Sequence, residues 1–219
     1  MTTPSPFTPS SDPTTPGHYT PSQTALLLLD FHELFIAKAA GPSAGAAVRT
    51  AARLRSWAKD LGIPVLHCLI DAEGSPFPTA KGYDRLVGIV KMLASGEPAE
   101  LTEELTEGGS GEEKTFTRRP GYVSALKSPG LLEWLRNRGI RSLVLAGLST
   151  SGCVLRTACA ACDEEFVVTV VGDACADVRG DLHEGCLEAV GMRGFVVGAE
   201  ELIGGFGVVD GEEEGGKGV

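Results

Sequence analysis

The stretch SLVLAGLSTSGC, residues 142–153, decides which fold the sequence predicts. Residues 142–146 form a mostly apolar run with the length of a buried strand, and a helix is expected from Cys153 to about Glu165. Only the small polar turn 149–152 separates the two. A strand followed at once by a helix is the repeating unit of α/β proteins, so the same alternation is expected along the rest of the chain.

Short apolar runs do alternate with helical spacing on both sides of that stretch. The other predicted strands are 25–29, 65–70, 115–118, 167–171 and 195–197, and the other predicted helices are 47–61, 79–94, 129–138 and 181–192. Strands that are apolar on both faces are typical of parallel sheets covered by helices on each side. The sequence therefore predicts an α/β fold, a three-layer α/β/α sandwich with a mostly parallel, doubly wound sheet.

Both ends of the chain differ in composition from its middle. Residues 1–22 contain six of the thirteen prolines, among Ser and Thr, and the last ten residues are acidic and rich in glycine. Such segments bury too little apolar surface to offset the entropy lost on ordering. We expect a disordered arm at 1–22, one domain at 23–208, and a disordered acidic tail at 209–219, with a mobile loop at 95–113 inside the domain.

Charge and cysteine usage limit the classes of partner. The formal net charge of −10 repels phosphate backbones and anionic lipid, so nucleic acid is not an expected partner. The sequence lacks a run of about 18 apolar residues and a secretory signal, so we expect no membrane association and a cytoplasmic location. The cysteines lie in strand-like or helix-like stretches and are expected to be free thiols, at 68, 153, 159, 162, 175 and 186.

Asp30 stands directly after the apolar run 25–29. In an open parallel sheet, ligands bind outside the carboxyl ends of the strands. A carboxylate is costly to bury there unless it is partnered or used. From the sequence, Asp30 is either a functional carboxylate or a residue that caps the next helix and accepts backbone hydrogen bonds.

Cys153 comes after the apolar run 142–146 and the turn 149–152, at the expected start of a helix. Unpaired backbone N–H groups and the positive end of the helix dipole lower the pKa of a thiol in that position. The amides of Gly152 and Cys153 are also placed to receive a developing oxyanion. The alternative interpretation is a buried structural cysteine.

Several blocks of the sequence match, in order and spacing, one known group of enzymes. The blocks are LLLLD (26–30), SAL (124–126), LVLAG (143–147), STSGCV (149–154) followed by Thr157-Ala158, and VTVVGDA (168–174). Together they resemble the isochorismatase-like cysteine hydrolase superfamily. Nicotinamidases, N-carbamoylsarcosine amidohydrolases and isochorismatases share that fold, and the presence of the cysteine favours the amidohydrolase-like branch.

The resemblance implies a catalytic triad of Asp, Lys and Cys, in which Asp30 and Cys153 match the first and last members. The carboxylate takes the thiol proton, the thiolate attacks a carbonyl, ammonia or an amine leaves, and water cleaves the thioester. At the lysine position the best match is Arg119, with Arg118 and Lys114 as alternatives. Arginine can stabilise a thiolate or an oxyanion, but with a pKa above about 12 it cannot exchange protons.

Other site residues are expected around this triad. The resemblance implies a non-proline cis peptide within Ser149 to Gly152. Residues that could contact a substrate are His32, Tyr122, Ser149 and Arg156. His32 could instead belong to the core or to a cap, and Arg156 could hold a substrate anion or face solvent. The remaining lining of the pocket is expected from segment 71–113, which resembles the family least.

No metal or other cofactor is expected. Nicotinamidases hold a divalent ion with an Asp-x-His…His cluster after the second strand, whereas residues 67–74 read HCLIDAEG and lack that spacing. The first strand is followed by residues 30–33, DFHE, without the Gly-rich turn of nucleotide or flavin sites. The lone C-x-x-C at 159–162 is expected to serve helix packing rather than zinc binding or redox chemistry.

The function expected from the resemblance is hydrolysis of a C–N bond in a small-molecule amide or carbamoyl substrate. Cys153 would be the nucleophile, Asp30 the base, and Arg119 would stand in place of the lysine. The rival hypothesis is a catalytically silent ligand-binding or scaffolding member of the superfamily, which that arginine suggests. A homo-oligomer is expected from the resemblance alone.

Overall fold

One parallel sheet organises the part of the chain that the computed structural model describes, residues 5–38, 40–94, 105 and 111–206. Its strands are β1 (Thr24–Leu29), β2 (Val65–Ile70), β3 (Glu113–Arg118), β4 (Ser142–Leu148), β5 (Val167–Ala176) and β6 (Phe195–Val197). They lie in the order β3-β2-β1-β4-β5-β6, and every pair of neighbours is parallel. The predicted doubly wound sheet is confirmed, and its strand order reverses direction between β1 and β4.

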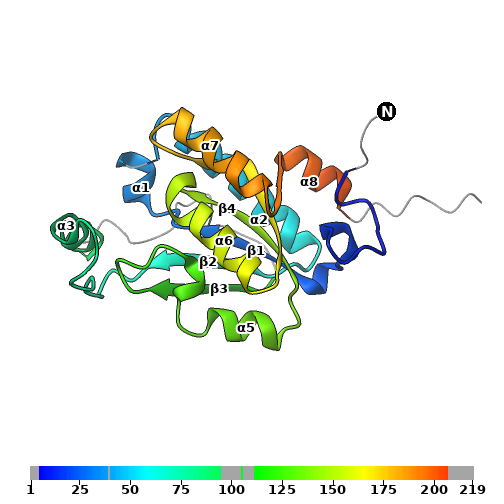
Figure 1. Cartoon of the computed structure of the whole chain (residues 1–219), viewed down its shortest axis with the longest axis horizontal. Helices are drawn as coiled ribbons and strands as arrows, with labels where there is room; N and C mark the ends of the chain where they lie inside the picture. Colours follow the sequence, from blue (N-terminus) through cyan, green and yellow to red (C-terminus); the bar gives the residue numbers. More distant parts are fainter. Residues whose placement is uncertain (1–4, 39, 95–104, 106–110, 207–219) are drawn as a thin grey trace, which may run out of the picture.

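Helices cover both faces of this sheet (Figure 1). One layer contains α2 (Ala44–Asp60) and α8 (Ala199–Gly205), with α1 (Glu33–Lys38) packed against α2. The opposite layer contains α5 (Leu131–Asn137), α6 (Leu155–Asp163) and α7 (Gly180–Gly191). The three-layer α/β/α sandwich is therefore confirmed.

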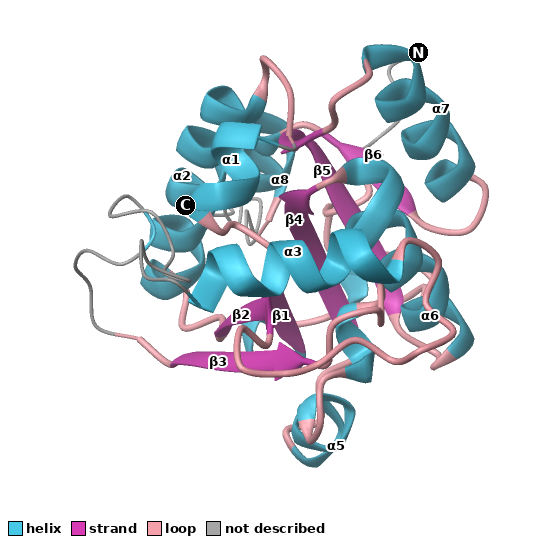
Figure 2. Ribbon diagram, turned by 90° about the vertical axis from the view of Figure 1, so that its left-hand side faces the viewer, coloured by secondary structure: helices cyan, strands magenta, loops and turns pink. Residues whose placement is uncertain are grey.

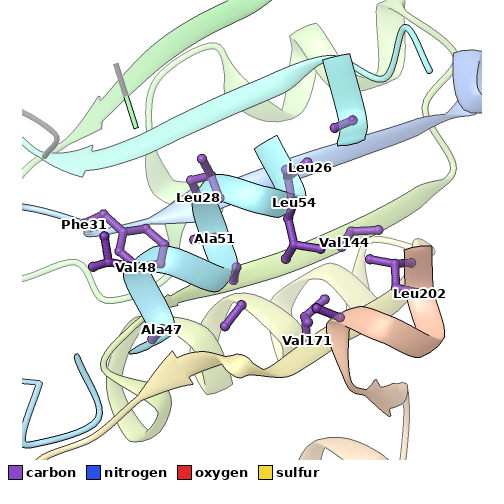
Figure 3. Packing of buried hydrophobic residues seen from close by; sticks show 14 of the residues in the cluster. Leu26, Leu28, Phe31, Ala47, Val48, Ala51, Leu54, Val144, Val171 and Leu202 are labelled. Atoms are coloured by element: carbon purple, nitrogen blue, oxygen red, sulfur yellow. The ribbon is translucent and has the colours of Figure 1, made fainter. Parts of the chain in front are cut away.

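The alternation of side chains along β1 explains why helices pack on both faces of the sheet. Side chains of successive strand residues point to opposite faces. Leu26 and Leu28 belong to the cluster under α2 and α8, whereas Leu27 and Leu29 belong to the cluster under α5 and α6. Figure 3 shows the first cluster, in which Leu54 of α2 lies close to Leu26. All six residues of β1 are buried, so this strand forms the centre of the core.

Helix α3 (Tyr83–Ala94) belongs to neither layer. Leu93 is its one buried residue, and Figure 1 shows the helix set apart from the rest of the molecule. Figure 2 looks from that side and shows α3 crossing in front of the strands. The helix therefore stands over one edge of the sheet rather than on a face.

The N-terminal segment differs from the prediction of a disordered arm at 1–22. The described residues 5–22 pack against the domain and include two 3-10 turns, at Pro16–His18 and Pro21–Gln23. Phe7 is buried, and its ring lies 6.1 Å from that of Phe206, which in turn lies 5.3 Å from that of Trp57. The buried side chains of Phe7 and Pro16 supply apolar contacts that the composition of this segment does not indicate.

Some predicted segments lie wholly or largely outside the described residues. These are the acidic tail 209–219 and most of the loop 95–113, of which Leu105 and residues 111–113 are described. In the described part of the chain, no helix is long and apolar enough to cross a membrane.

Candidate active site

The reversal of strand order brings the ends of β1 and β4 together. Leu29 pairs with Gly147, so the residues that follow these strands share the carboxyl edge of the sheet. Asp30 follows β1 with a positive φ of 57°, which aspartate tolerates better than most residues, and its amide donates to the carbonyl of Cys68 at 3.0 Å. Ligands of doubly wound sheets bind at such a reversal.

Asp30 forms a bidentate ion pair with Arg118, the last residue of β3. Arg118 Nη1 and Nη2 donate to the two carboxylate oxygens of Asp30 at 2.8 and 2.6 Å. Arg118 Nε donates to the carbonyl of Tyr122 at 3.0 Å, so the guanidinium is held from two sides. Both charged side chains are almost fully buried, with 2% and 5% exposed for Arg118 and Asp30.

The predicted match to the family lysine, Arg119, lies elsewhere. Arg119 is exposed, and its guanidinium donates to the carbonyls of Ser75 and Pro76 at 2.8 and 3.3 Å. Strand parity explains the difference, because Phe116 and Arg118 are the buried residues of β3 and alternate side chains share a face. Applied to the sequence, this parity would have favoured Arg118.

The Asp30–Arg118 pair keeps the guanidinium charged. Burial alone would lower the pKa of Arg118, but the neighbouring carboxylate of Asp30 raises it above its ordinary value. Arg118 therefore cannot supply or accept a proton near neutral pH. Its contribution is to hold the carboxylate in place and to supply positive charge.

Cys153 is buried at 3% exposed and lies in the same electrostatic environment. Burial raises the pKa of its thiol, the charge of Asp30 raises it further, and the charge of Arg118 and a contact with Thr157 Oγ1 at 3.7 Å oppose these effects. The sequence predicted a lowered pKa from a helix start. The structure gives the opposite direction, because loss of water on burial has the largest effect on the pKa of this thiol.

Cys153 lies within a π-helical turn, Thr150–Val154, rather than in the first turn of a regular helix. It follows a cis peptide between Leu148 and Ser149, one bond before the predicted range Ser149 to Gly152. The amide of Gly152 donates to the carbonyl of Ser149 at 3.1 Å. Helix α6 begins only at Leu155.

Two residues that were not among the predicted site residues, Asp177 and His183, contact this turn. Asp177, directly after β5, accepts hydrogen bonds from the amide and the hydroxyl of Ser151 at 2.8 and 2.7 Å. His183 Nδ1 lies 2.8 Å from Thr150 Oγ1. Asp177 stands at the carboxyl end of a strand, as Asp30 does, and this signal could have identified it.

His32 lies beneath the site rather than in it. It is fully buried, its Nε2 accepts a hydrogen bond from the amide of Ile70 at 3.1 Å, and the same atom lies 3.9 Å from Asp30 Oδ1. It is not among the residues that line the cavity. Arg156 is exposed and does not line the cavity either. His32 therefore lies in the core next to Asp30, and neither His32 nor Arg156 is placed to contact a substrate.

A cavity of about 430 Å³ opens above these groups. Asp30, Arg118 and Cys153 line it together with Ser149 and Tyr122. The segment before α3 and α3 itself provide another wall, as expected for residues 71–113, with Phe77, Thr79, Ala80, Lys81, Arg85, Leu86 and Ile89. The volume is typical of small-molecule sites. Among the described residues, no group of three or more His, Cys, Asp or Glu side chains could hold a metal ion.

Comparison of the sequence with known proteins identifies a protein family that the chain matches. The isochorismatase domain model matches residues 24–201. Maleamate amidohydrolase from Pseudomonas putida is 31% identical over 73% of this chain and 75% of its own length.

Solved structures share the fold. A cysteine hydrolase from Pseudomonas syringae pv. phaseolicola 1448A matches with a TM-score of 0.72 and 20% identity, over 85% of this chain and 93% of that chain. N-carbamoylsarcosine amidase from Thermoplasma acidophilum matches with a TM-score of 0.64 and 23% identity, over 81% and 97%. At these identities the structural likeness bears on the fold alone.

Proposed function

This chain belongs to the isochorismatase family of hydrolases, and we propose that it cleaves the C–N bond of a small amide or carbamoyl compound through a thioester on Cys153. The observation that carries the proposal is the meeting of Asp30, Arg118 and Cys153 in one cavity at the reversal of strand order. The likeness to maleamate amidohydrolase supports an amide as the substrate class.

Asp30 is the proposed base. Each carboxylate oxygen has two lone pairs, and Arg118 occupies one on each oxygen, which leaves acceptor capacity for a thiol proton. Because the pKa of Cys153 is raised, the resting group is the neutral thiol. The proton therefore passes to Asp30 as the sulfur attacks, and no free thiolate accumulates beforehand.

The proposed reaction has two halves. The sulfur of Cys153 forms a bond to the substrate carbonyl carbon, the C–N bond breaks, and ammonia or an amine leaves with the proton that Asp30 received. Asp30 then takes a proton from water, the hydroxyl adds to the thioester, the C–S bond breaks, and the thiol regains its proton. Arg118 stays charged throughout and acts as a positioning and electrostatic group.

The amide of Cys153 is the proposed oxyanion donor. The other predicted donor, the amide of Gly152, already donates to the carbonyl of Ser149. Loss of one such donor typically costs about 10²–10³-fold in rate. Ser149 and Tyr122 line the cavity and are proposed to contact the substrate.

A panel of small amides and carbamoyl compounds tests the proposal through ammonia release. The wild type should turn over at least one compound, and Cys153→Ala should abolish that turnover. Acid-quenched wild type should carry an acyl adduct on Cys153, seen by peptide mass spectrometry. Equal turnover by wild type and Cys153→Ala would contradict the proposal.

A catalytically silent, ligand-binding protein is the second candidate. The observations that favour it are the arginine in place of lysine at residue 118 and the raised pKa of Cys153. This candidate predicts that amides bind in calorimetry to wild type and to Cys153→Ala equally, with no release of ammonia from either.

A homo-oligomer stays a prediction of the family resemblance. Sedimentation at micromolar concentration checks it, and a monomer would contradict it.

A further inference from the structure

The cavity carries a charge opposite to that of the chain. The whole protein has a formal net charge of −10. The charged side chains that line the cavity are Asp30, Arg118, Lys81 and Arg85, so cations outnumber anions there. Since Asp30 and Arg118 neutralise each other in a bidentate pair, Lys81 and Arg85 supply the excess.

Lys81 and Arg85 have no partner that would explain their placement. Within the described part of the chain, neither side chain makes an ion pair or a hydrogen bond. Some other exposed arginines do pair, for example Arg53 with Glu200 at 2.6 Å and Arg136 with Glu164 at 2.5 Å. The two side chains on the cavity wall are therefore available to a ligand.

Helix stability does not account for these cations either. Arg85 is the third residue of α3, and Lys81 lies two residues before the helix. The N-terminal end of a helix dipole is positive, so cations there are unfavourable. A negatively charged ligand would remove this cost.

Apart from these charged groups, the cavity lining is largely apolar. Asp30, Arg118 and Cys153 come from the ends of the strands and the turn after β4, whereas Lys81 and Arg85 come from the wall at α3. The apolar side chains that line the same cavity include Phe35, Ile70, Leu86, Ile89 and Leu148. A matching ligand has a reactive carbonyl at one end, a short apolar spacer, and an anion at the other.

We propose that the substrate is a small amide that carries a carboxylate, of the class of monoamides of short dicarboxylic acids, and that Lys81 and Arg85 bind the carboxylate. This inference rests on the proposed amide hydrolysis for its reacting end. The recognition of charge by Lys81 and Arg85 is independent of the chemistry at Cys153.

The test compares compounds of the same shape and different charge. Succinamate and maleamate each carry one carboxylate, and succinamide and maleamide replace it with a neutral amide. Wild type should prefer the monoamides in kcat/KM. Lys81→Met and Arg85→Met should each lower kcat/KM for the monoamides by about five- to tenfold, through KM, and leave the diamides unchanged. Lys91→Met, on α3 but away from the cavity, is the matched control and should behave as wild type.

Calorimetry on Cys153→Ala separates this inference from the proposed reaction. In that background, monoamides should bind more tightly than diamides, and added Lys81→Met or Arg85→Met should remove the difference even if wild type hydrolyses nothing. Equal binding of both classes, or a preference that survives both substitutions, would overturn the inference and leave hydrolysis of neutral amides standing. Binding of neither class would also overturn it.

Discussion

Strand β3 has a cluster of charged side chains at each end, and the two clusters have different surroundings. At its first residue, Glu113 accepts hydrogen bonds from three cationic or titratable side chains, Arg55, Lys59 and His67. At its last residue, Arg118 binds Asp30. The Glu113 cluster does not line the cavity, whereas both Asp30 and Arg118 do.

We interpret the Glu113 cluster as serving stability and the Asp30–Arg118 pair as serving the proposed reaction. In parallel α/β sheets, the carboxyl ends of strands face the ligand and the amino ends do not. Glu113 therefore ties α2, β2 and β3 together, whereas Arg118 holds Asp30 at the cavity that Cys153 also lines. Substitutions at the two ends should thus damage different properties.

The largest expected effect is on activity at the carboxyl end. Asp30→Asn removes the proposed base and should lower kcat by about 10²–10⁴-fold with any substrate found. Steady-state ammonia release measures it, and circular dichroism checks that the fold persists. If Asp30→Asn kept activity within tenfold of wild type, the proposed difference in role between the two ends of β3 would be contradicted.

At the amino end, the expected loss is of stability. Glu113→Gln removes the negative charge that Arg55 and Lys59 contact and should lower the free energy of unfolding by about 2–3 kcal/mol, less than for a fully buried pair because Glu113 is partly exposed. Thermal unfolding should show a fall in Tm of about 5–10 °C. Turnover below that Tm should match wild type, and a large loss of turnover would contradict the comparison.

The same cluster predicts how stability depends on pH. Despite partial burial, which raises it, the pKa of Glu113 is lowered to about 2 by the hydrogen bonds of Arg55, Lys59 and His67. Because this folded-state pKa lies below the unfolded value, the stabilisation is present above about pH 4.5 and is lost as pH falls toward 2. Burial lowers the pKa of His67, which adds a loss in the same direction from about pH 6.5 downward. The Tm of Glu113→Gln should fall less than that of wild type between pH 4.5 and 2.5.

A smaller effect on kcat is expected at Asp177, which contacts the turn that contains Cys153. Asp177→Ala removes the two hydrogen bonds that hold Ser151, and should lower kcat about tenfold with little change in KM. Asp173→Ala is the control, because Asp173 lies within β5 and also accepts a hydrogen bond from a backbone amide, that of Ala199, rather than from the turn. Equal kinetics of the two variants would remove Asp177 as a positioning residue.

The smallest effect is expected for Arg119, and it tests whether Arg118 rather than Arg119 belongs to the site. Arg119→Met should change kcat and KM by less than about twofold, because the side chain of Arg119 contacts the carbonyls of Ser75 and Pro76 and the ring of Phe77 and makes no other polar contact with the described residues. A loss of activity as large as that of Asp30→Asn would return Arg119 to the site.

The sequence predicted the sheet well because buried parallel strands leave a clear apolar signal. The predicted strand 25–29 is followed directly by Asp30, and the predicted strand 142–146 leads through the turn 149–152 to Cys153, so both ends of the site could be placed. The resemblance to the family matched Arg119 to the lysine, whereas the structure pairs the adjacent Arg118 with Asp30. Strand parity, not similarity, distinguishes Arg118 from Arg119.

Other features depended on contacts between distant segments. The burial of Phe7 against Phe206 has no local signal, and composition alone predicted disorder. The raised pKa of Cys153 follows from burial and from the charge of Asp30, neither of which the local sequence reveals. Lys81 and Arg85 became site residues only when α3 was placed over the edge of the sheet.

The alkylation of Cys153 by iodoacetamide, followed across pH by peptide mass spectrometry, tests most directly whether Asp30 acts on Cys153. Because the charge of Asp30 raises the pKa of the thiol and that of Arg118 lowers it, Asp30→Asn should move the alkylation midpoint to lower pH while abolishing turnover. Asp173→Asn should leave the midpoint unchanged. An identical midpoint in wild type and Asp30→Asn would contradict the account, because the carboxylate would then not act on the sulfur.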